Sequence, residues 1–243
     1  MRKLLALGAI GACLAFSGLA AANLSINKLW VEFKEGDQER NDLIVRNDSE
    51  DRYYVTISVA EILNAGTDAE TKVAETDPEK LGLLVTPSQL VLEPGALRSI
   101  RLVSLNKDLV KDRIYRVLVA PQVGAIKARG NGEESRGIAI KMLAAYDVLV
   151  IDKPVGAAAN IQSQRFPDHV SLTNAGNTNI LIAEGYVCPA TIEKDPTAET
   201  CQRFEAKRLY SGGEMTLALK APTDRVFVKT RTGPAANFVE QIF

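Results

Sequence analysis

The sequence contains few of the residues that build catalytic and metal sites. Its 243 residues include one histidine, His169, and three cysteines. A catalytic triad would have to be built around that histidine, and no G-x-S-x-G, H-E-x-x-H or Walker sequence occurs. The glycines of 130–132 lack the lysine and the helix that a phosphate loop needs. We therefore expect no enzyme, no cofactor and no metal site, and we place His169 on a strand surface or edge.

The sequence also lacks a charge bias and a long apolar segment. Its formal net charge is −1 at pH 7, from 29 basic and 30 acidic residues. A chain with so little net charge lacks the excess of basic residues that is typical of nucleic-acid-binding proteins. The apolar run Leu4–Leu19 is too short and too rich in glycine for a membrane span, and no other stretch approaches the required length. We expect neither a nucleic-acid partner nor a membrane span.

Residues 1–22 have the pattern of a secretory signal peptide. A short basic start, Met1–Lys3, precedes the apolar run, and Ala20–Ala22 offers an A-x-A cleavage site before Asn23. Cys13 follows Ile-Gly-Ala and offers the alternative of a lipid anchor, but the apolar core ahead of it would be very short. We predict cleavage after Ala22 and export to an oxidising compartment.

Two cysteines, Cys188 and Cys201, remain after that cleavage. A disulfide is the expected state of such a pair in an exported chain. A redox or metal role is disfavoured, since there is no C-x-x-C and no nearby histidine. A disulfide between Cys188 and Cys201 would close a loop of roughly a dozen residues, and the loss of chain entropy in the unfolded state would stabilise the domain by about 3 kcal/mol.

Short runs of β-branched and aromatic residues, separated by turn residues, predict an all-β fold. The first set comprises Asn41–Asn47, Tyr53–Ile62, Leu83–Leu92, Ala96–Leu105 and Ile114–Val123. The second set comprises His169–Thr173, Asn179–Val187, Arg203–Tyr210, Met215–Lys220 and Arg225–Thr230. Between the sets, Asp152-Lys153-Pro154 leads into a featureless stretch of small residues. This rhythm predicts two antiparallel β-sandwiches in series.

The segment Gly137–Asp152 is predicted to form a long apolar strand after a polar, glycine-rich loop over 124–136. Period-2 alternation places one set of side chains on a single face. This set comprises Ile138, Ile140, Met142, Ala144, Tyr146 and Val148. An exposed strand edge is an aggregation hazard, so a protein that keeps one usually pairs it with another chain. The alternative is that Ile138, Ile140 and Met142 face their own core; Leu143, Ala145 and Leu149 are the core candidates on the other face.

The segment Leu83–Leu102 resembles the periplasmic chaperones of the chaperone-usher pilus pathway. The matching pieces are V-T-P, L-x-P-G and I-R-L, followed by the charged, aromatic stretch Asp112–Val117. Within that family the chain is most similar to the alternate branch that serves colonisation-factor-type fimbriae. The pieces shared with that branch are Asn174–Asn177, Tyr186–Cys188 and Cys201.

This resemblance implies two immunoglobulin-like β-sandwich domains in an L or boomerang arrangement, over residues 23–152 and 153–243. Such a periplasmic chaperone folds and caps pilin subunits and the adhesin, and delivers them to an outer-membrane usher. It does so by donor-strand complementation, in which Ile138, Ile140 and Met142 of the subunit-binding strand would enter the open groove of the pilin. The free protein could also self-associate through this donor strand.

One family feature is missing from the sequence. The better-known branch grips the carboxylate of the pilin with an arginine on the first strand and a lysine on the binding strand. Here Trp30 stands at the arginine position, and the lysine position falls near Tyr146 or Asp147. We expect Lys28 and Tyr146 to form the carboxylate anchor in the cleft, with contributions from Arg116 or Lys141. The alternative is that these are ordinary solvated side chains.

A rival function is that of a secreted β-sandwich protein, such as an adhesin, a pilus structural subunit or a sugar-binding module. A pilus structural subunit should lack one strand and begin with a free extension of alternating apolar residues. In this sequence the stretch before Leu29–Phe33 is short once the signal is removed. The sequence therefore favours the chaperone.

Overall fold

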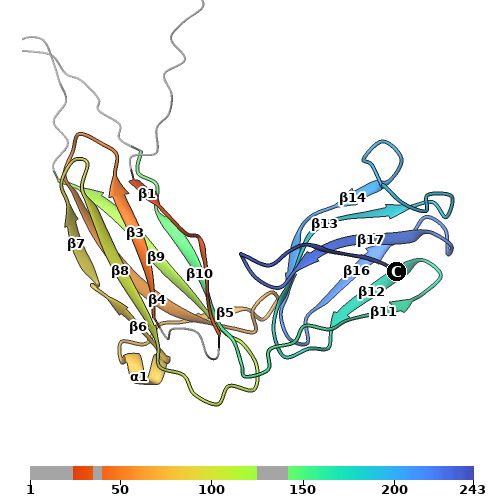
Figure 1. The fold of residues 1–243 in the computed structure, drawn as a ribbon, viewed down its shortest axis with the longest axis horizontal. Coiled ribbons are helices and arrows are strands. Elements are labelled where there is room, and N and C mark those ends of the chain that lie inside the picture. The colour runs from red at the N-terminus through yellow and green to blue at the C-terminus, as the bar shows by residue number, and fades with distance from the viewer. Residues whose placement is uncertain (1–23, 35–39, 125–141) are drawn as a thin grey trace, which may run out of the picture.

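The computed structural model describes residues 24–34, 40–124 and 142–243, which form two β-rich lobes (Figure 1). The first lobe contains strands β1–β10 and the short helix α1 (Pro78–Leu81), and the second contains β11–β18. Each lobe is built from two sheets that enclose an apolar core. The predicted all-β fold with two sandwiches is confirmed. The proposed domain limit between Asp152 and Lys153 remains a proposal.

The first lobe packs two sheets against each other. One sheet has the order β1 (Leu24–Ile26), β3 (Arg40–Asn47), β8 (Leu97–Ser104) and β6 (Leu83–Thr86). The other has the order β2 (Trp30–Phe33), β10 (Tyr146–Asp152), β9 (Arg113–Val123), β4 (Tyr53–Leu63) and β5 (Thr71–Val73), with β7 (Gln89–Leu92) also paired to β4. Burial alternates along β4, where Tyr53, Val55 and Ile57 are buried and the residues between them are exposed. This alternation is the reason that one face of the sheet supplies the core.

The prediction of one strand over Leu83–Leu92 was wrong. Pro87 has no backbone N–H and interrupts the run, which therefore forms two strands, β6 and β7. β6 pairs with β8 in one sheet and β7 pairs with β4 in the other. The segment thus crosses from one sheet of the sandwich to the other.

The chain makes a second crossing between β1 and β2. β1 pairs antiparallel with β3, whereas β2 runs parallel to β10 in the other sheet. The pairing of β2 with β10 covers Leu149–Asp152 only. In the described part of the chain, residues 146–148 of β10 therefore pair with β9 on one side and with no strand on the other.

A buried polar network closes one end of the first lobe beside α1. Ser104 and the Asn106 amide both donate hydrogen bonds to Asp152. The Tyr115 hydroxyl accepts from Asn106 at 2.9 Å and donates to the carbonyl of Leu81, the last residue of α1, at 3.0 Å. Burial raises the pKa of Asp152 and raises that of Tyr115 to about 12. Because these groups satisfy one another, they tie the end of β10 to the loops around it.

The second lobe has a similar two-sheet construction. Its smaller sheet has the order β11 (Ile161–Arg165), β12 (His169–Asn174) and β16 (Glu214–Ala218). Its larger sheet has the order β14 (Gln202–Phe204), β13 (Ile180–Cys188), β17 (Arg225–Arg231) and β18 (Val239–Ile242), with β15 (Lys207–Leu209) also paired to β13. The predicted strand over Arg203–Tyr210 is wrong in one respect, because the segment forms two strands, β14 and β15, and neither β11 nor β18 was predicted from the sequence.

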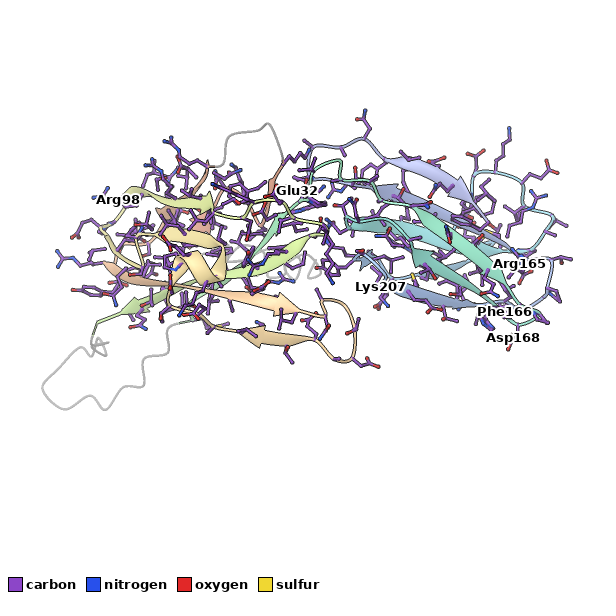
Figure 2. The ribbon with its side chains drawn as sticks, turned by 90° about the horizontal axis from the view of Figure 1, so that it is seen from below. Glu32, Arg98, Arg165, Phe166, Asp168 and Lys207 are labelled. Atoms are coloured by element: carbon purple, nitrogen blue, oxygen red, sulfur yellow. A yellow bond between two sulfur atoms is a disulfide. The ribbon has the colours of Figure 1, made fainter. Side chains whose placement is uncertain are left out.

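The predicted disulfide is confirmed, and it joins Cys188 at the end of β13 to Cys201 before β14. His169 begins β12, where its ring stacks on Phe166 at a centroid distance of 4.4 Å. Its Nδ1 lies 2.7 Å from a carboxylate oxygen of Asp168. Figure 2 shows Phe166 and Asp168 at the far end of the second lobe, while Glu32 lies where the lobes meet.

Candidate functional site

The two lobes meet across the outer face of the β2–β10–β9–β4 sheet. Strand register places Trp30 beside Leu149, Leu149 beside Arg116, and Arg116 beside Ala60, in one row across that face. An apolar cluster on the same face packs against the second lobe. That cluster consists of Ile62, Ile114, Leu149 and Ile151, with Trp30, Ala65 and Tyr210 packed on it. The term lobe junction is used below for Trp30, Arg116 and Leu149 together with the second-lobe residues Arg208, Tyr210 and Arg231.

Trp30 contacts two arginines of the second lobe. The Arg208 guanidinium lies 3.9 Å from the centroid of the indole ring, and the Arg231 guanidinium lies 5.2 Å from it. Both arginines flank Leu181 of β13 in the strand register. A guanidinium within about 6 Å of an aromatic centroid is attracted to the ring face. The first lobe is thus held on the larger sheet of the second through β2.

A second connection runs through Asn179. Its backbone N–H and its side-chain amide donate to one carboxylate oxygen of Asp112, at 2.7 and 2.8 Å. Its side-chain carbonyl accepts a hydrogen bond from Arg208. Asp112 belongs to the β8–β9 loop of the first lobe, so the arginine that stacks on Trp30 is oriented by a chain of bonds that crosses between the lobes.

A third connection is a buried ion pair. The Lys153 ammonium lies 2.9 Å from a carboxylate oxygen of Glu32, and these side chains are only 5% and 3% exposed. The same ammonium donates to the Thr232 carbonyl in the β17–β18 connection at 2.5 Å. A Cβ at Gly233 would lie 2.7 Å from Glu32, so the connection approaches closely because glycine stands there. Burial raises the pKa of Glu32, although Lys153 opposes the shift.

The lobe junction carries an excess of positive charge. Burial lowers the pKa of Arg208, and the positive charges of Arg231 and Arg116 lower it further. Tyr210 and Glu32 act on the pKa of Arg208 in the opposite direction, and Glu32 already pairs with Lys153. Partly buried guanidinium groups that face one another are stabilised by an anion between them. The junction can therefore accept a carboxylate.

The open edge of β10 leads away from this charged region. The Leu149 N–H donates to the Leu29 carbonyl at 3.0 Å on the β2 side. Because backbone groups alternate sides along a strand, the N–H and C=O of Asp147 point to that same side. No described strand pairs with them there. An unpaired ladder edge of this kind can accept a strand from another chain.

Among the described residues, the predicted strand over Gly137–Asp152 forms only at Tyr146–Asp152, which is β10. Met142 is 85% exposed, and it lies just ahead of β10. Ile138 and Ile140 lie outside the described residues. Along β10, the even-numbered side chain of Val148 packs into the core of the first lobe, whereas the side chain of Leu149 on the other face packs at the lobe junction. Of the expected core residues on the other face, Leu143 packs on the first-lobe core, while Ala145 is exposed.

The two residues of the predicted carboxylate pair form hydrogen bonds with different partners. The Lys28 ammonium donates to the Asn41 side chain at 2.5 Å. The Tyr146 hydroxyl donates to the Leu24 carbonyl of β1, on the core side of β10. Arg116 does lie at the junction, and Lys141 lies outside the described residues. Arg208 and Arg231 were not predicted, because no local pattern links either of them to Trp30.

Two of the proteins to which this chain is similar are named as fimbrial subunits. No protein-family model matches the chain. The CS1 fimbrial subunit designated B of Escherichia coli is 26% identical over 226 residues, which cover 90% of both chains. The CFA/I fimbrial subunit designated A, also of Escherichia coli, is 26% identical over 175 residues, which cover 71% of both chains.

Solved structures with the same fold are fimbrial chaperones. The class 5 fimbriae chaperone CfaA superposes with a TM-score of 0.64 at 22% identity, covering 90% of this chain and 98% of its own. A chaperone–tip adhesin complex of CFA/I fimbriae biogenesis gives 0.60 at 22% identity, with 91% and 98% covered. The Salmonella enterica SafB chaperone in complex with the SafA pilin gives 0.58 at 13% identity, with 92% and 97% covered. The predicted likeness to pilus-assembly chaperones is confirmed in the fold.

Proposed function

We propose that the protein is a periplasmic chaperone of the chaperone-usher pathway. It binds pilin subunits and the adhesin by lending them a strand, and delivers them to an outer-membrane usher. The observation that carries this proposal is the edge of β10 over residues 146–148, which pairs with no strand among the described residues and lies next to a junction rich in arginine. The two-lobed fold shared with fimbrial chaperones supports it.

Strand lending would protect a pilin that lacks its last strand. The pilin would pair with the open edge of β10, where Asp147 presents its N–H and C=O. Ile138, Ile140 and Met142 would enter the apolar groove of the pilin ahead of that pairing. Each such side chain contributes roughly 1.5–3 kcal/mol when it is fully buried. Release follows when a segment with better packing replaces the lent strand, so no nucleotide is required.

Arg116 and Arg208 replace Lys28 and Tyr146 in our proposal for the carboxylate anchor. Both guanidinium groups belong to the lobe junction, and the charge of Arg116 acts on Arg208. Guanidinium groups bind carboxylates through paired, charge-assisted hydrogen bonds. A pilin paired along β10 would bring its terminal carboxylate toward Arg116 and Arg208 at the lobe junction.

The two curated relatives are named as fimbrial subunits, so a structural role in the pilus is the second candidate. A structural pilin in this pathway is one sandwich that lacks a strand. This chain instead forms two sandwiches, each with its own core. The chaperone interpretation accounts for both lobes, and the structural-pilin interpretation does not.

Export to the periplasm is part of the proposal. Cleavage after Ala22 would release a mature chain that starts at Asn23, which N-terminal sequencing of the secreted protein would reveal. In the described ranges, no helix has the length and apolar character needed to cross a membrane.

The experiment is co-expression with the pilin of the same gene cluster, followed by purification of the tagged chaperone from periplasmic extract. We expect Ile140→Asp to abolish co-purification of the pilin, because its carboxylate would be buried without a partner in the groove of the pilin. Gln162→Asp is the matched control, since Gln162 is an exposed residue of β11 in the second lobe. Equal pilin capture by wild type and Ile140→Asp would contradict strand lending.

A further inference from the structure

The β17–β18 hairpin extends from the second lobe to the lobe junction. Figure 1 shows this dark-blue connection reaching toward the first lobe. Gly233 lies against Glu32 of the first lobe, and Lys153, which pairs with Glu32, also binds the Thr232 carbonyl, so the first half of the connection is fixed to the first lobe. The second half, which leads into β18, carries an exposed aromatic residue, Phe238.

Phe238 continues the row of stacked groups that begins at Trp30. Arg231 lies 5.2 Å from the Trp30 ring centroid and 5.2 Å from that of Phe238. Lys229 lies 5.9 Å from the Phe238 centroid. Val226, Val228 and Thr230 alternate with these cations and are buried, so the row lies on the outer face of the sheet. It forms a surface that is continuous with the lobe junction.

In this row, the charge of Arg231 is not fully compensated and the ring of Phe238 is not fully buried. Phe238 is 48% exposed, although it is a large apolar side chain beside two cations. The Nε of Arg231 is buried and has no hydrogen-bond partner among the described residues. The same guanidinium donates to the uncharged Pro234 carbonyl, at 3.3 Å. Of the two cations beside Phe238, only Lys229 has a carboxylate within ion-pair distance in the described part of the chain, that of Glu240 at 3.4 Å.

We propose that Arg231 and Phe238 form a second contact surface for the bound pilin. They select a pilin that presents an apolar side chain next to an acidic one. The inference rests on the proposed function, because a pilin paired along β10 reaches the junction where the row begins. The positive charge of Arg231 and Arg208 favours an acidic partner over a basic one. Phenylalanine and arginine are both enriched at protein interfaces, and arginine is among the residues that most often dominate the binding energy there.

The test measures binding of purified chaperone to the pilin of the same gene cluster, diluted from denaturant into the chaperone. We expect Phe238→Ser to weaken the equilibrium affinity about tenfold, as is usual for truncation of an interface anchor. Ile242→Ser is the control, because Ile242 is 55% exposed and lies at the other end of β18. We expect this control to bind like wild type.

A charge series at the same position tests the acidic partner. We expect Phe238→Glu to bind more weakly than Phe238→Ser, and Phe238→Lys to bind more tightly than Phe238→Glu, with a difference that shrinks as salt is added. Circular dichroism and thermal unfolding establish that each variant is folded. Equal affinities for Phe238→Glu and Phe238→Lys would overturn the preference for an acidic partner.

The outcomes separate this inference from the proposed function. If wild type captures pilin and Phe238→Ser captures it equally well, the hairpin contact is refuted and strand lending stands. If Ile242→Ser is as weak as Phe238→Ser, the effect belongs to the stability of β18 and the contact is also refuted. If wild type captures no pilin, both proposals are overturned.

Discussion

Removing the Trp30 indole should weaken the attachment between the two lobes. Trp30 is the only tryptophan of the sequence, and it contacts Arg208 at 3.9 Å and Arg231 at 5.2 Å. Cation–π contacts are worth about 0.5–1 kcal/mol at exposed sites and about 2 kcal/mol when desolvated. Since Arg208 is the nearer and the junction is partly buried, we expect Trp30→Ala to lower the free energy of unfolding by about 2–3 kcal/mol. Trp30→Phe, which keeps a ring face, should lose about 1 kcal/mol or less.

A double-mutant cycle isolates the contact from the general cost of removing a large side chain. Wild type, Trp30→Ala, Arg208→Met and the double variant are unfolded in urea, with circular dichroism as the readout because Trp30→Ala removes the intrinsic tryptophan signal. We expect a coupling energy of about 1–2 kcal/mol between the two positions. A coupling energy near zero would refute the view that this stack joins the lobes.

Two further predictions concern the charged groups of the junction. Arg116→Gln should weaken pilin binding about 10- to 100-fold, because one charge-assisted hydrogen bond is worth about 1.5–3 kcal/mol. The same substitution should leave the midpoint of thermal unfolding almost unchanged. Isothermal titration calorimetry measures the binding, and thermal unfolding measures the midpoint. Burial raises the pKa of Glu32 above its ordinary value of 4.5, so the unfolded chain ionises at lower pH than the folded one. Wild type should therefore lose stability relative to Glu32→Gln as the pH rises from about 4.5 through the folded pKa, and the difference should be constant above it. Urea unfolding of both proteins across that range would contradict this account if the difference did not change or changed in the opposite direction.

The parts of the fold that depend on local pattern could be predicted from the sequence. Alternation along β4 and the turn residues between runs predict strands, since each strand buries one face. The Cys188–Cys201 pair follows from the export signal and the absence of metal ligands nearby in the sequence. The division of Leu83–Leu92 into two strands at Pro87 could have been predicted, because proline has no N–H to donate to the hydrogen bonds between strands.

The junction could not be predicted in the same way. Period-2 alternation states which residues share a face, but it does not state what that face meets. Tyr146 lies on the side of β10 that packs into the first lobe, and its hydroxyl bonds Leu24, so it is not available as a carboxylate anchor at the junction. Arg208 and Arg231 reach Trp30 only because the lobes are docked against each other. Such long-range contacts leave no signal in the spacing of a single sequence.

Backbone hydrogen exchange at Asp147 shows directly whether a pilin pairs with β10. The amide N–H of Asp147 points to the side where, in the described residues, no strand pairs with it, so it should exchange rapidly in the free protein. We predict that this amide becomes strongly protected in the purified complex with pilin, together with alternate amides of the segment ahead of it. An Asp147 amide that exchanges equally fast in the free protein and in the complex would contradict the account.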